Sequence, residues 1–128
     1  MIGLDTTAII DLFKGDEGIK KFIKNNKEPF SATILSYAEL MFGIKDKKHQ
    51  EEEEFYDDFF TEVYSFDLTK DACKMASRLH NDLKGKGKET GHFDSLIASI
   101  FLSNGVTKVL TRNKKHFERF SSVDVIGY

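Results

Sequence analysis

The chain opens with Met1-Ile2-Gly3-Leu4-Asp5-Thr6-Thr7, a short apolar run that ends on a carboxylate and two hydroxyls. This pattern predicts a buried strand over the apolar residues and a helix that begins beyond Asp5. In an open α/β sheet, ligands bind at the carboxyl ends of the strands. Asp5 is therefore either the N-cap of that helix, the commoner role of such a residue, or the first part of a functional site.

Outward from this stretch, short apolar segments alternate with helical patterns along the chain. The further segments that favour strands are residues 30–34, 64–68, 106–110 and 123–126. The segments that favour helices are residues 8–13, 17–25, 36–44, 55–63, 71–83, 92–102 and 114–120. Strands separated by helices require parallel pairing, with helices on both faces of the sheet. We therefore predict an α/β fold.

The composition indicates one globular domain over residues 1–128, with 40% hydrophobic residues and 12 Phe. No signal peptide and no apolar run of about 20 residues is visible, so we expect no membrane span. The single Cys excludes an intrachain disulfide and suits a reducing compartment such as the cytoplasm. Because the net charge is −2, any contact with nucleic acid must come from a local basic patch.

Glu39 and Asp94 are two further acids near the start of a predicted helix. Glu39 stands three residues after Ser36, which is the spacing of a capping box, in which its side chain would accept the Ser36 backbone N–H. Asp94 lies in a first helical turn, where the helix dipole favours a carboxylate. Taken alone, each acid therefore has a structural explanation.

Taken together, Asp5, Glu39 and Asp94 are expected along one rim of the parallel sheet. Three carboxylates there repel one another unless they are spread apart or neutralised by a cation. Mg²⁺ and Mn²⁺ take carboxylate oxygens and waters and need no His or Cys. Such a metal can activate water and stabilise charge on a phosphoryl oxygen. The three acids are therefore candidate metal ligands.

A fourth stretch, Leu110-Thr111-Arg112-Asn113-Lys114-Lys115, also follows a predicted strand and should reach the same rim. Residues 108–119 hold five basic residues and one acid, and Lys84, Lys86 and Lys88 form a second basic cluster. Cations beside an acidic site suit a polyanion, because phosphate contacts supply most of the affinity for nucleic acids. For any single lysine, the alternative is an ordinary solvated surface position.

These motifs together resemble the PIN-domain family, and in particular its small VapC-type ribonuclease toxins of prokaryotic toxin–antitoxin pairs. The matching segments cover nearly the whole chain and are residues 2–7, residues 36–40 with Gly43, residues 94–98 and residues 111–117. The resemblance implies a three-layer α/β/α sandwich with a central, mainly parallel sheet. It also implies a Mg²⁺- or Mn²⁺-dependent endoribonuclease.

The resemblance assigns roles to individual residues. Asp5, Glu39 and Asp94 match the family's acids that hold metal and position the attacking water. Thr6 and Thr111 are expected to orient these acids by hydrogen bonding. The residues expected to bind RNA are Arg112, Lys114, Lys115, Lys86 and Lys88.

The last motif departs from the family's pattern. Asn113 stands where the family often has a fourth acid, and His116 occupies another position that is frequently Asp. The amide oxygen of Asn113 can bond a metal-bound water but brings no charge, so we expect Asn113 in the catalytic set with a weaker second-metal site.

The resemblance also implies partners: an RNA substrate, a cognate antitoxin whose tail occupies the acidic groove, and a second copy of the chain in a homodimer. Apolar residues available for a groove or dimer face, with ordinary core as the alternative, are Met41, Phe42, Phe55, Phe59 and Phe60.

Two other classes of function remain open. The first is a PIN-like module that binds RNA or a partner without catalysis, which the missing fourth acid favours. The second is a phosphoacceptor receiver domain, which also places Asp residues at strand ends. Receivers usually pair two acids after the first strand, where this chain has only Asp5.

Overall fold

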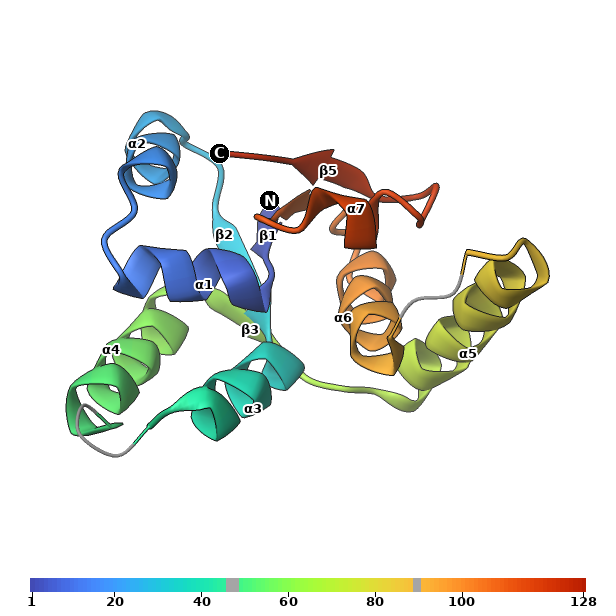
Figure 1. The fold of residues 1–128 in the computed structure, drawn as a ribbon, viewed down its shortest axis with the longest axis horizontal. Helices are drawn as coiled ribbons and strands as arrows, with labels where there is room; N and C mark the ends of the chain where they lie inside the picture. The colour runs from blue at the N-terminus through green and yellow to red at the C-terminus, as the bar shows by residue number, and fades with distance from the viewer. Residues whose placement is uncertain (46–48, 89–90) are drawn as a thin grey trace.

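A computed structural model of the chain describes residues 1–45, 49–88 and 91–128, and these form a parallel five-stranded sheet in the order β3-β2-β1-β4-β5 (Figure 1). The strands are β1 (Ile2–Leu4), β2 (Phe30–Thr33), β3 (Tyr64–Phe66), β4 (Lys108–Leu110) and β5 (Asp124–Ile126). β1 pairs with β2 on one side and with β4 on the other. The opening stretch of the sequence is therefore the centre of the sheet.

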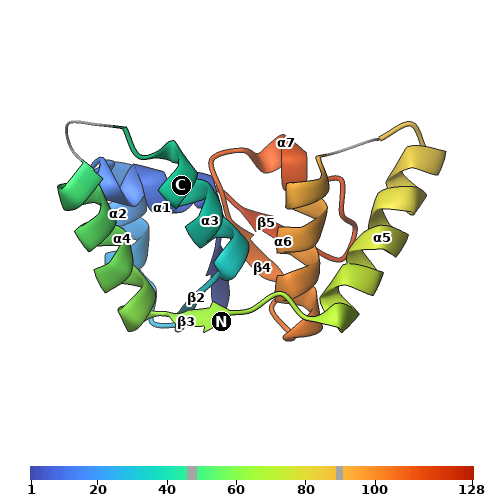
Figure 2. The same ribbon diagram turned by 90° about the horizontal axis from the view of Figure 1, so that it is seen from below.

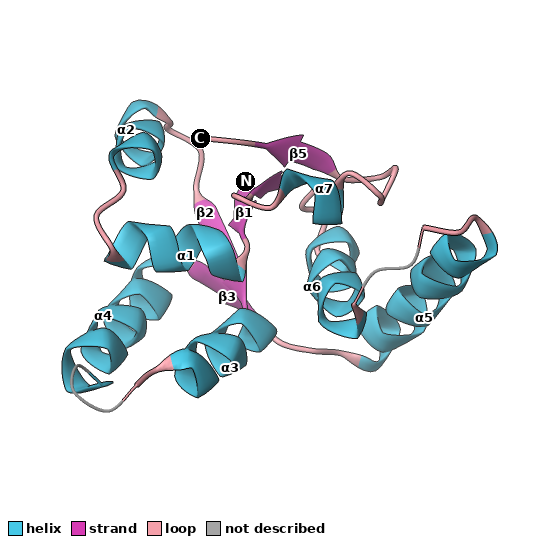
Figure 3. Ribbon diagram, in the orientation of Figure 1, coloured by secondary structure: helices cyan, strands magenta, loops and turns pink. Residues whose placement is uncertain are grey.

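Helices cover both faces of this sheet (Figures 2 and 3). They are α1 (Thr6–Phe13), α2 (Glu17–Asn25), α3 (Ile34–Gly43), α4 (His49–Glu62), α5 (Lys70–Gly85), α6 (His92–Ser103) and α7 (Lys114–Phe117). Figure 2 shows α1, α2 and α4 on one side of the sheet and α5 and α6 on the other. The predicted three-layer α/β/α sandwich around a parallel sheet is confirmed.

The alternation of side chains along β1 builds a separate core on each face. Ile2 and Leu4 are buried in the cluster that α1, α2 and α4 cover. Gly3 faces the other way, against the buried ring of Phe101 on α6. A strand that is covered on both faces needs apolar or small residues at every position, which explains the unbroken apolar opening.

The strand order reverses at β1, because the chain adds β2 and β3 on one side and then β4 and β5 on the other. Such a reversal leaves a crevice at the carboxyl ends of the two strands that flank it, here β1 and β4. Asp5 and Thr111 directly follow these strands, and the backbone N–H of Asp5 donates to the carbonyl oxygen of Leu110 at 3.2 Å. The fold therefore brings Asp5 and the fourth motif together.

The start of α3 differs from the prediction. The helix begins at Ile34, and its N-cap is Thr33, whose hydroxyl oxygen accepts the backbone N–H of Ser36 at 3.2 Å. The prediction of a capping box between Ser36 and Glu39 is therefore wrong, and Glu39 lies beyond the first turn of α3. The physical reason is that the last residue of β2 provides the cap itself, so the chain passes from strand to helix without a loop.

Other boundaries agree more closely. α2 has the predicted bounds, and α5 begins close to its predicted start, where the hydroxyl oxygen of its N-cap Thr69 accepts the Ala72 N–H at 3.1 Å. β4 and α7 are shorter than predicted. Residues 46–48, between the predicted helices 36–44 and 55–63, lie outside the described residues. Within the described parts of the chain, every helix is too short or too polar to cross a bilayer.

Gly3→Ala should destabilise the protein by about 1–3 kcal/mol, because overpacking of a filled core costs this much. An added Cβ would lie 2.5 Å from Cε1 of Phe101, a ring that is fully buried. Urea unfolding measures the effect, and Phe101→Leu in the same chain should recover part of it. Gly85→Ala is the control, since a Cβ there meets nothing within 4 Å. Wild-type stability for Gly3→Ala would contradict this packing of β1 on α6.

Candidate active site

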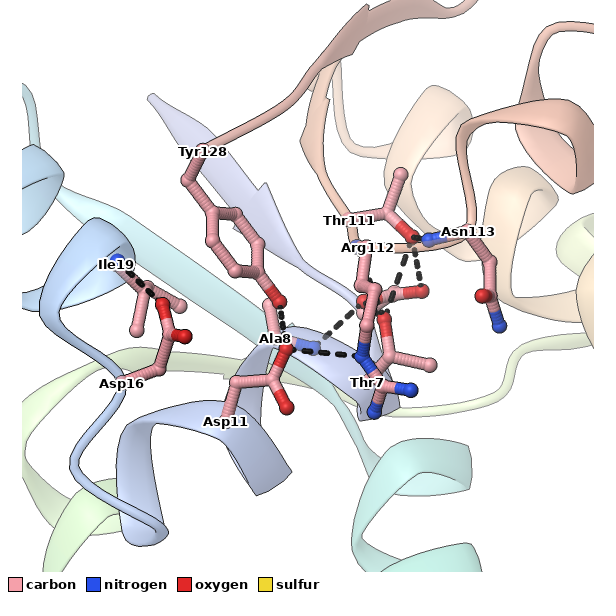
Figure 4. A network of polar contacts seen from close by, with 10 residues as sticks. Thr7, Ala8, Asp11, Asp16, Ile19, Thr111, Arg112, Asn113 and Tyr128 are labelled. Carbon is pink, nitrogen blue, oxygen red and sulfur yellow. Dashed lines mark hydrogen bonds and ion pairs between the residues drawn. The ribbon is translucent and has the colours of Figure 1, made fainter.

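Asp5 is a buried carboxylate, 3% exposed, at the carboxyl end of the central strand. Its Oδ1 accepts hydrogen bonds from the Ala8 backbone N–H at 3.0 Å and the Thr7 hydroxyl at 2.8 Å. Its Oδ2 accepts the hydroxyl of Thr111 at 2.6 Å, and Figure 4 shows Thr7, Ala8 and Thr111 gathered there. The bond from Ala8 makes Asp5 the N-cap of α1, which is the commoner role of such a residue. The hydrogen bonds from the hydroxyls of Thr7 and Thr111 are not needed for capping and indicate a second role.

The electrostatics of Asp5 favour a nearby cation. Burial raises the pKa of its carboxyl above the ordinary value of 3.8, and the negative charge of Asp94 adds to this effect. The hydrogen bonds from Thr111, Ala8 and Thr7 act in the opposite direction. A buried carboxylate near a second acid is stabilised in its ionised form when a positive charge enters the same pocket.

Glu39 reaches the same region from α3. Its Oε1 accepts the hydroxyl of Thr6 at 2.7 Å, and the Thr6 oxygen also lies 3.0 Å from the hydroxyl oxygen of Ser36. Thr6 is the first residue of α1, directly after Asp5. Two adjacent residues of the opening stretch thus contact two different acids: Thr6 contacts Glu39, and Thr7 contacts Asp5.

Asp94 lies in the first turn of α6, and its Oδ2 is 3.1 Å from Nδ1 of His116. The three acids line one open pocket of about 420 Å³, together with Asn113 and His116. The apolar residues that line the rest of the pocket are Ile10, Phe93, Ile97 and Phe117. Four separate elements of the chain therefore contribute polar groups to a single pocket at the crevice between β1 and β4.

The donor set fits a hard cation, because the three acids offer only oxygen ligands. Among the described residues, no three His, Cys, Asp or Glu side chains lie close enough to form a direct metal cage. Mg²⁺ does not require one, since it usually keeps several waters and binds one or two carboxylates together with substrate phosphates. An open pocket lined by separated carboxylates has the chemistry for such a hydrated ion.

The predicted basic residues fall into two groups. Arg112 lies beside the pocket, and its Nε donates to Asp11 at 2.9 Å; Lys114 and Lys115 follow on α7. Lys86 and Lys88 instead line a separate pocket, together with Arg119. The structure thus brings the acids and the fourth motif to one pocket, but it does not bring the second basic cluster there.

Two polar residues of this site, Thr7 and Ser36, are not among those predicted from the sequence. Thr7 donates to Asp5, lies 3.4 Å from the Thr111 hydroxyl oxygen and accepts the backbone N–H of Arg112 at 3.1 Å. Ser36 contacts Thr6. Thr7 was visible as the second hydroxyl of the opening stretch, whereas no local pattern distinguishes Ser36 from a helix cap.

The fold and the pocket define an α/β protein with a carboxylate-lined site at the reversal point of a parallel sheet. The sequence matches the PIN domain family over residues 2–123, and the chain belongs to this family. The resemblance inferred from the four motifs is therefore confirmed, and the receiver-domain alternative is excluded.

Known relatives agree with this assignment. Ribonuclease VapC2 of Rickettsia felis is 32% identical over 101 residues, which is 78% of this chain and 73% of that protein. The crystal structure of VapBC2 from Rickettsia felis bound to a DNA fragment from their promoter contains a similar chain, with a TM-score of 0.86, 24% identity, and coverage of 100% and 99% of the two chains. The structure of VapBC-1 from nontypeable Haemophilus influenzae also contains a similar chain, with a TM-score of 0.81 and 25% identity. The match covers 99% of this chain and 98% of that one.

Asp5→Asn should become more stable relative to wild type as pH rises. Between pH 3.8 and the raised pKa of Asp5, the folded wild type holds a proton that the unfolded chain has released, so its stability falls as pH rises through that interval. The variant lacks this titration, so its free energy of unfolding relative to that of the wild type should rise through this interval and then level off. Urea unfolding of both proteins with a chelator, from about pH 4 to about pH 8, measures the difference. An advantage that shrinks with rising pH would mean that the pKa is lowered.

Proposed function

We propose that this chain is the ribonuclease toxin of a toxin–antitoxin pair and hydrolyses RNA phosphodiester bonds with Mg²⁺ or Mn²⁺. The observation that carries the proposal is the single pocket lined by Asp5, Glu39 and Asp94 from three separate elements. Family membership and the similarity to Ribonuclease VapC2 support the same activity. A chain with one cysteine that acts on RNA is suited to the cytoplasm.

In this proposal Asp5, Glu39 and Asp94 would hold a hydrated metal ion in the pocket that they line. When bound, the ion would supply an activated water and stabilise charge on a phosphoryl oxygen. The protein's own contribution is orientation. Thr111 fixes one oxygen of Asp5 and Thr6 fixes one oxygen of Glu39, each through a short hydrogen bond. Groups that orient ligands in this way set the affinity and geometry of a metal site.

Asn113 completes the catalytic set as a neutral member. It lines the acidic pocket, and its backbone N–H donates to the Thr111 hydroxyl oxygen at 2.9 Å. Its amide oxygen can accept a hydrogen bond from a water of the ion's shell, but it adds no charge. The same departure from the family's pattern is what favours a module that binds RNA without turnover.

The RNA backbone would contact the basic residues near the pocket, Arg112, Lys114 and Lys115, with Lys86 and Lys88 as a more distant contact. All five side chains are exposed. Phosphate contacts of this kind give affinity without sequence preference, and specificity comes from loops and pocket shape.

The proposed partners are a cognate antitoxin and a second copy of the chain. Of the five apolar residues considered for such contacts, Met41, Phe55, Phe59 and Phe60 are partly buried and pack against the core. Phe42 alone of these five is exposed, at 89%. A large apolar side chain so exposed on α3 is the candidate contact of that group.

Asp94→Asn and Glu39→Gln should each lower RNA cleavage by about 100-fold or more, because a lost metal ligand removes several kcal/mol of transition-state stabilisation. Cleavage of a defined RNA panel is measured against Mg²⁺ and Mn²⁺ concentration, with melting temperature as the check on folding. Asp67→Asn, an exposed acid outside the pocket, is the matched control.

Wild-type cleavage by both pocket variants would overturn the proposed site. RNA binding by the wild-type protein with no turnover at any metal concentration would instead favour the non-catalytic module.

Asn113→Asp should lower the Mg²⁺ concentration for half-maximal cleavage by about tenfold, since a residue that acts on a metal through its waters changes affinity by this order. Asn113→Ala is the matched comparison and should raise that concentration. Metal titrations of cleavage and of melting temperature measure both effects. A requirement unchanged in both variants would remove Asn113 from the catalytic set.

A further inference from the structure

Asp11 is a nearly buried acid on α1 that the proposed chemistry does not use. Its side chain is 14% exposed, and its Oδ2 accepts two hydrogen bonds. One comes from Nε of Arg112 at 2.9 Å and the other from the hydroxyl of Tyr128 at 2.5 Å (Figure 4). Asp11 therefore joins α1 to the fourth motif and to the segment that follows β5.

Arg112 is held at two points on one face of α1. Its backbone N–H donates to the Thr7 hydroxyl at 3.1 Å, and its side chain donates to Asp11. Thr7 and Asp11 are four residues apart, so they lie one above the other on the helix. Because Thr7 also donates to Asp5, the position of Arg112 is tied to the buried carboxylate of the pocket.

The contact with Asp11 leaves the functional end of Arg112 available. It uses Nε, and the two terminal nitrogens make no hydrogen bond with Asp11. The Arg112 side chain is 52% exposed. These two nitrogens are the pair that binds two phosphate oxygens at once, which is why arginine is suited to phosphate recognition.

Tyr128 supports this arrangement as a hydrogen-bond donor. Burial raises the pKa of its hydroxyl above the ordinary value of 10.0, and the bond to Asp11 raises it further. The hydroxyl therefore keeps its proton at neutral pH and continues to donate to Asp11. The bonds from Tyr128 and Arg112 thus meet on the same oxygen of Asp11, Oδ2.

We propose that Asp11 and Tyr128 are positioning residues that hold the Arg112 guanidinium as a preformed clamp for an RNA phosphate beside the acidic pocket. The inference rests on the proposed function, because it assumes an RNA substrate. Ordering a long side chain costs affinity when it happens on binding. Here the folded protein has already restricted Arg112, so that cost does not fall on the RNA complex.

The direction in which Asp11→Asn changes RNA affinity distinguishes a positioning role of Asp11 from an effect of its charge alone. Removing a carboxylate makes the protein more positive, which on electrostatics alone should tighten RNA binding. Loss of positioning should instead weaken binding about threefold to tenfold, the cost of ordering one long side chain. The measurement is equilibrium binding of a fluorescently labelled single-stranded RNA over a range of salt, with a chelator present to prevent cleavage.

The other variants test the same contacts. Tyr128→Phe should weaken binding about twofold, since it loses one hydrogen bond to Asp11. Arg112→Ala should lower the salt dependence by about 0.7 in log–log slope, one phosphate contact on a single strand. Arg112→Lys should keep that slope but bind less tightly, because it retains the charge and lacks the paired donors. Glu17→Gln, an exposed acid on α2, is the control for charge and should not weaken binding.

Two results would overturn the clamp. One is Asp11→Asn binding RNA as tightly as wild type or more tightly. The other is that Asp11→Asn weakens RNA binding by the same factor in the Arg112→Ala background as in the wild type. That result would mean that Asp11 acts through the fold and not through Arg112. Because binding is measured without cleavage, failure of the clamp and failure of the nuclease proposal are distinguishable.

Discussion

The structure of the site depends on one buried carboxylate, Asp5, at the end of the central strand. Its oxygens are bonded by a backbone N–H and by the hydroxyls of Thr7 and Thr111. A charge in this position is unfavourable unless it is hydrogen-bonded or paired. The hydroxyls satisfy part of that requirement and also fix the distance between β1 and the segment after β4. A cation from solvent would compensate the charge that the hydrogen bonds leave unpaired. The burial that destabilises the ionised Asp5 carboxylate therefore also favours the binding of a metal ion.

The fold was largely readable from the sequence, because each strand and helix carries its own local signal. The unbroken apolar run at residues 2–4 indicated a strand covered on both faces, and the alternation of strands with helices indicated parallel pairing. The start of α3 was misread, since both Thr33 and Ser36 are suitable caps and local pattern does not choose between them. The choice depends on where β2 ends, and this is set by its pairing with β1 and β3.

The residues of the site were predictable and most of their contacts were not. The positions of Asp5 and Asp94 at helix starts follow from the sequence, whereas Glu39 lies beyond the first turn of α3. The convergence of the three acids depends on the order of the strands. The bond between Thr6 and Glu39 spans 33 positions in the chain, and no local pattern reports it. The pairing of Asp11 with Arg112, which spans 101 positions, was invisible for the same reason.

The hydrogen bond between Thr111 and Asp5 joins residues 106 positions apart, which has a consequence for the chain during translation. A ribosome that has added residues 1–105 has produced Asp5, Glu39 and Asp94 but neither β4 nor the hydroxyl that orients the first acid. Contacts between such distant positions form late, after the intervening chain has been made. All three acids are present once residue 94 has been added, but the pocket can assemble only after β4 and Thr111 have followed. A destructive activity built on this site would be delayed until Thr111 has been added and has left the ribosome.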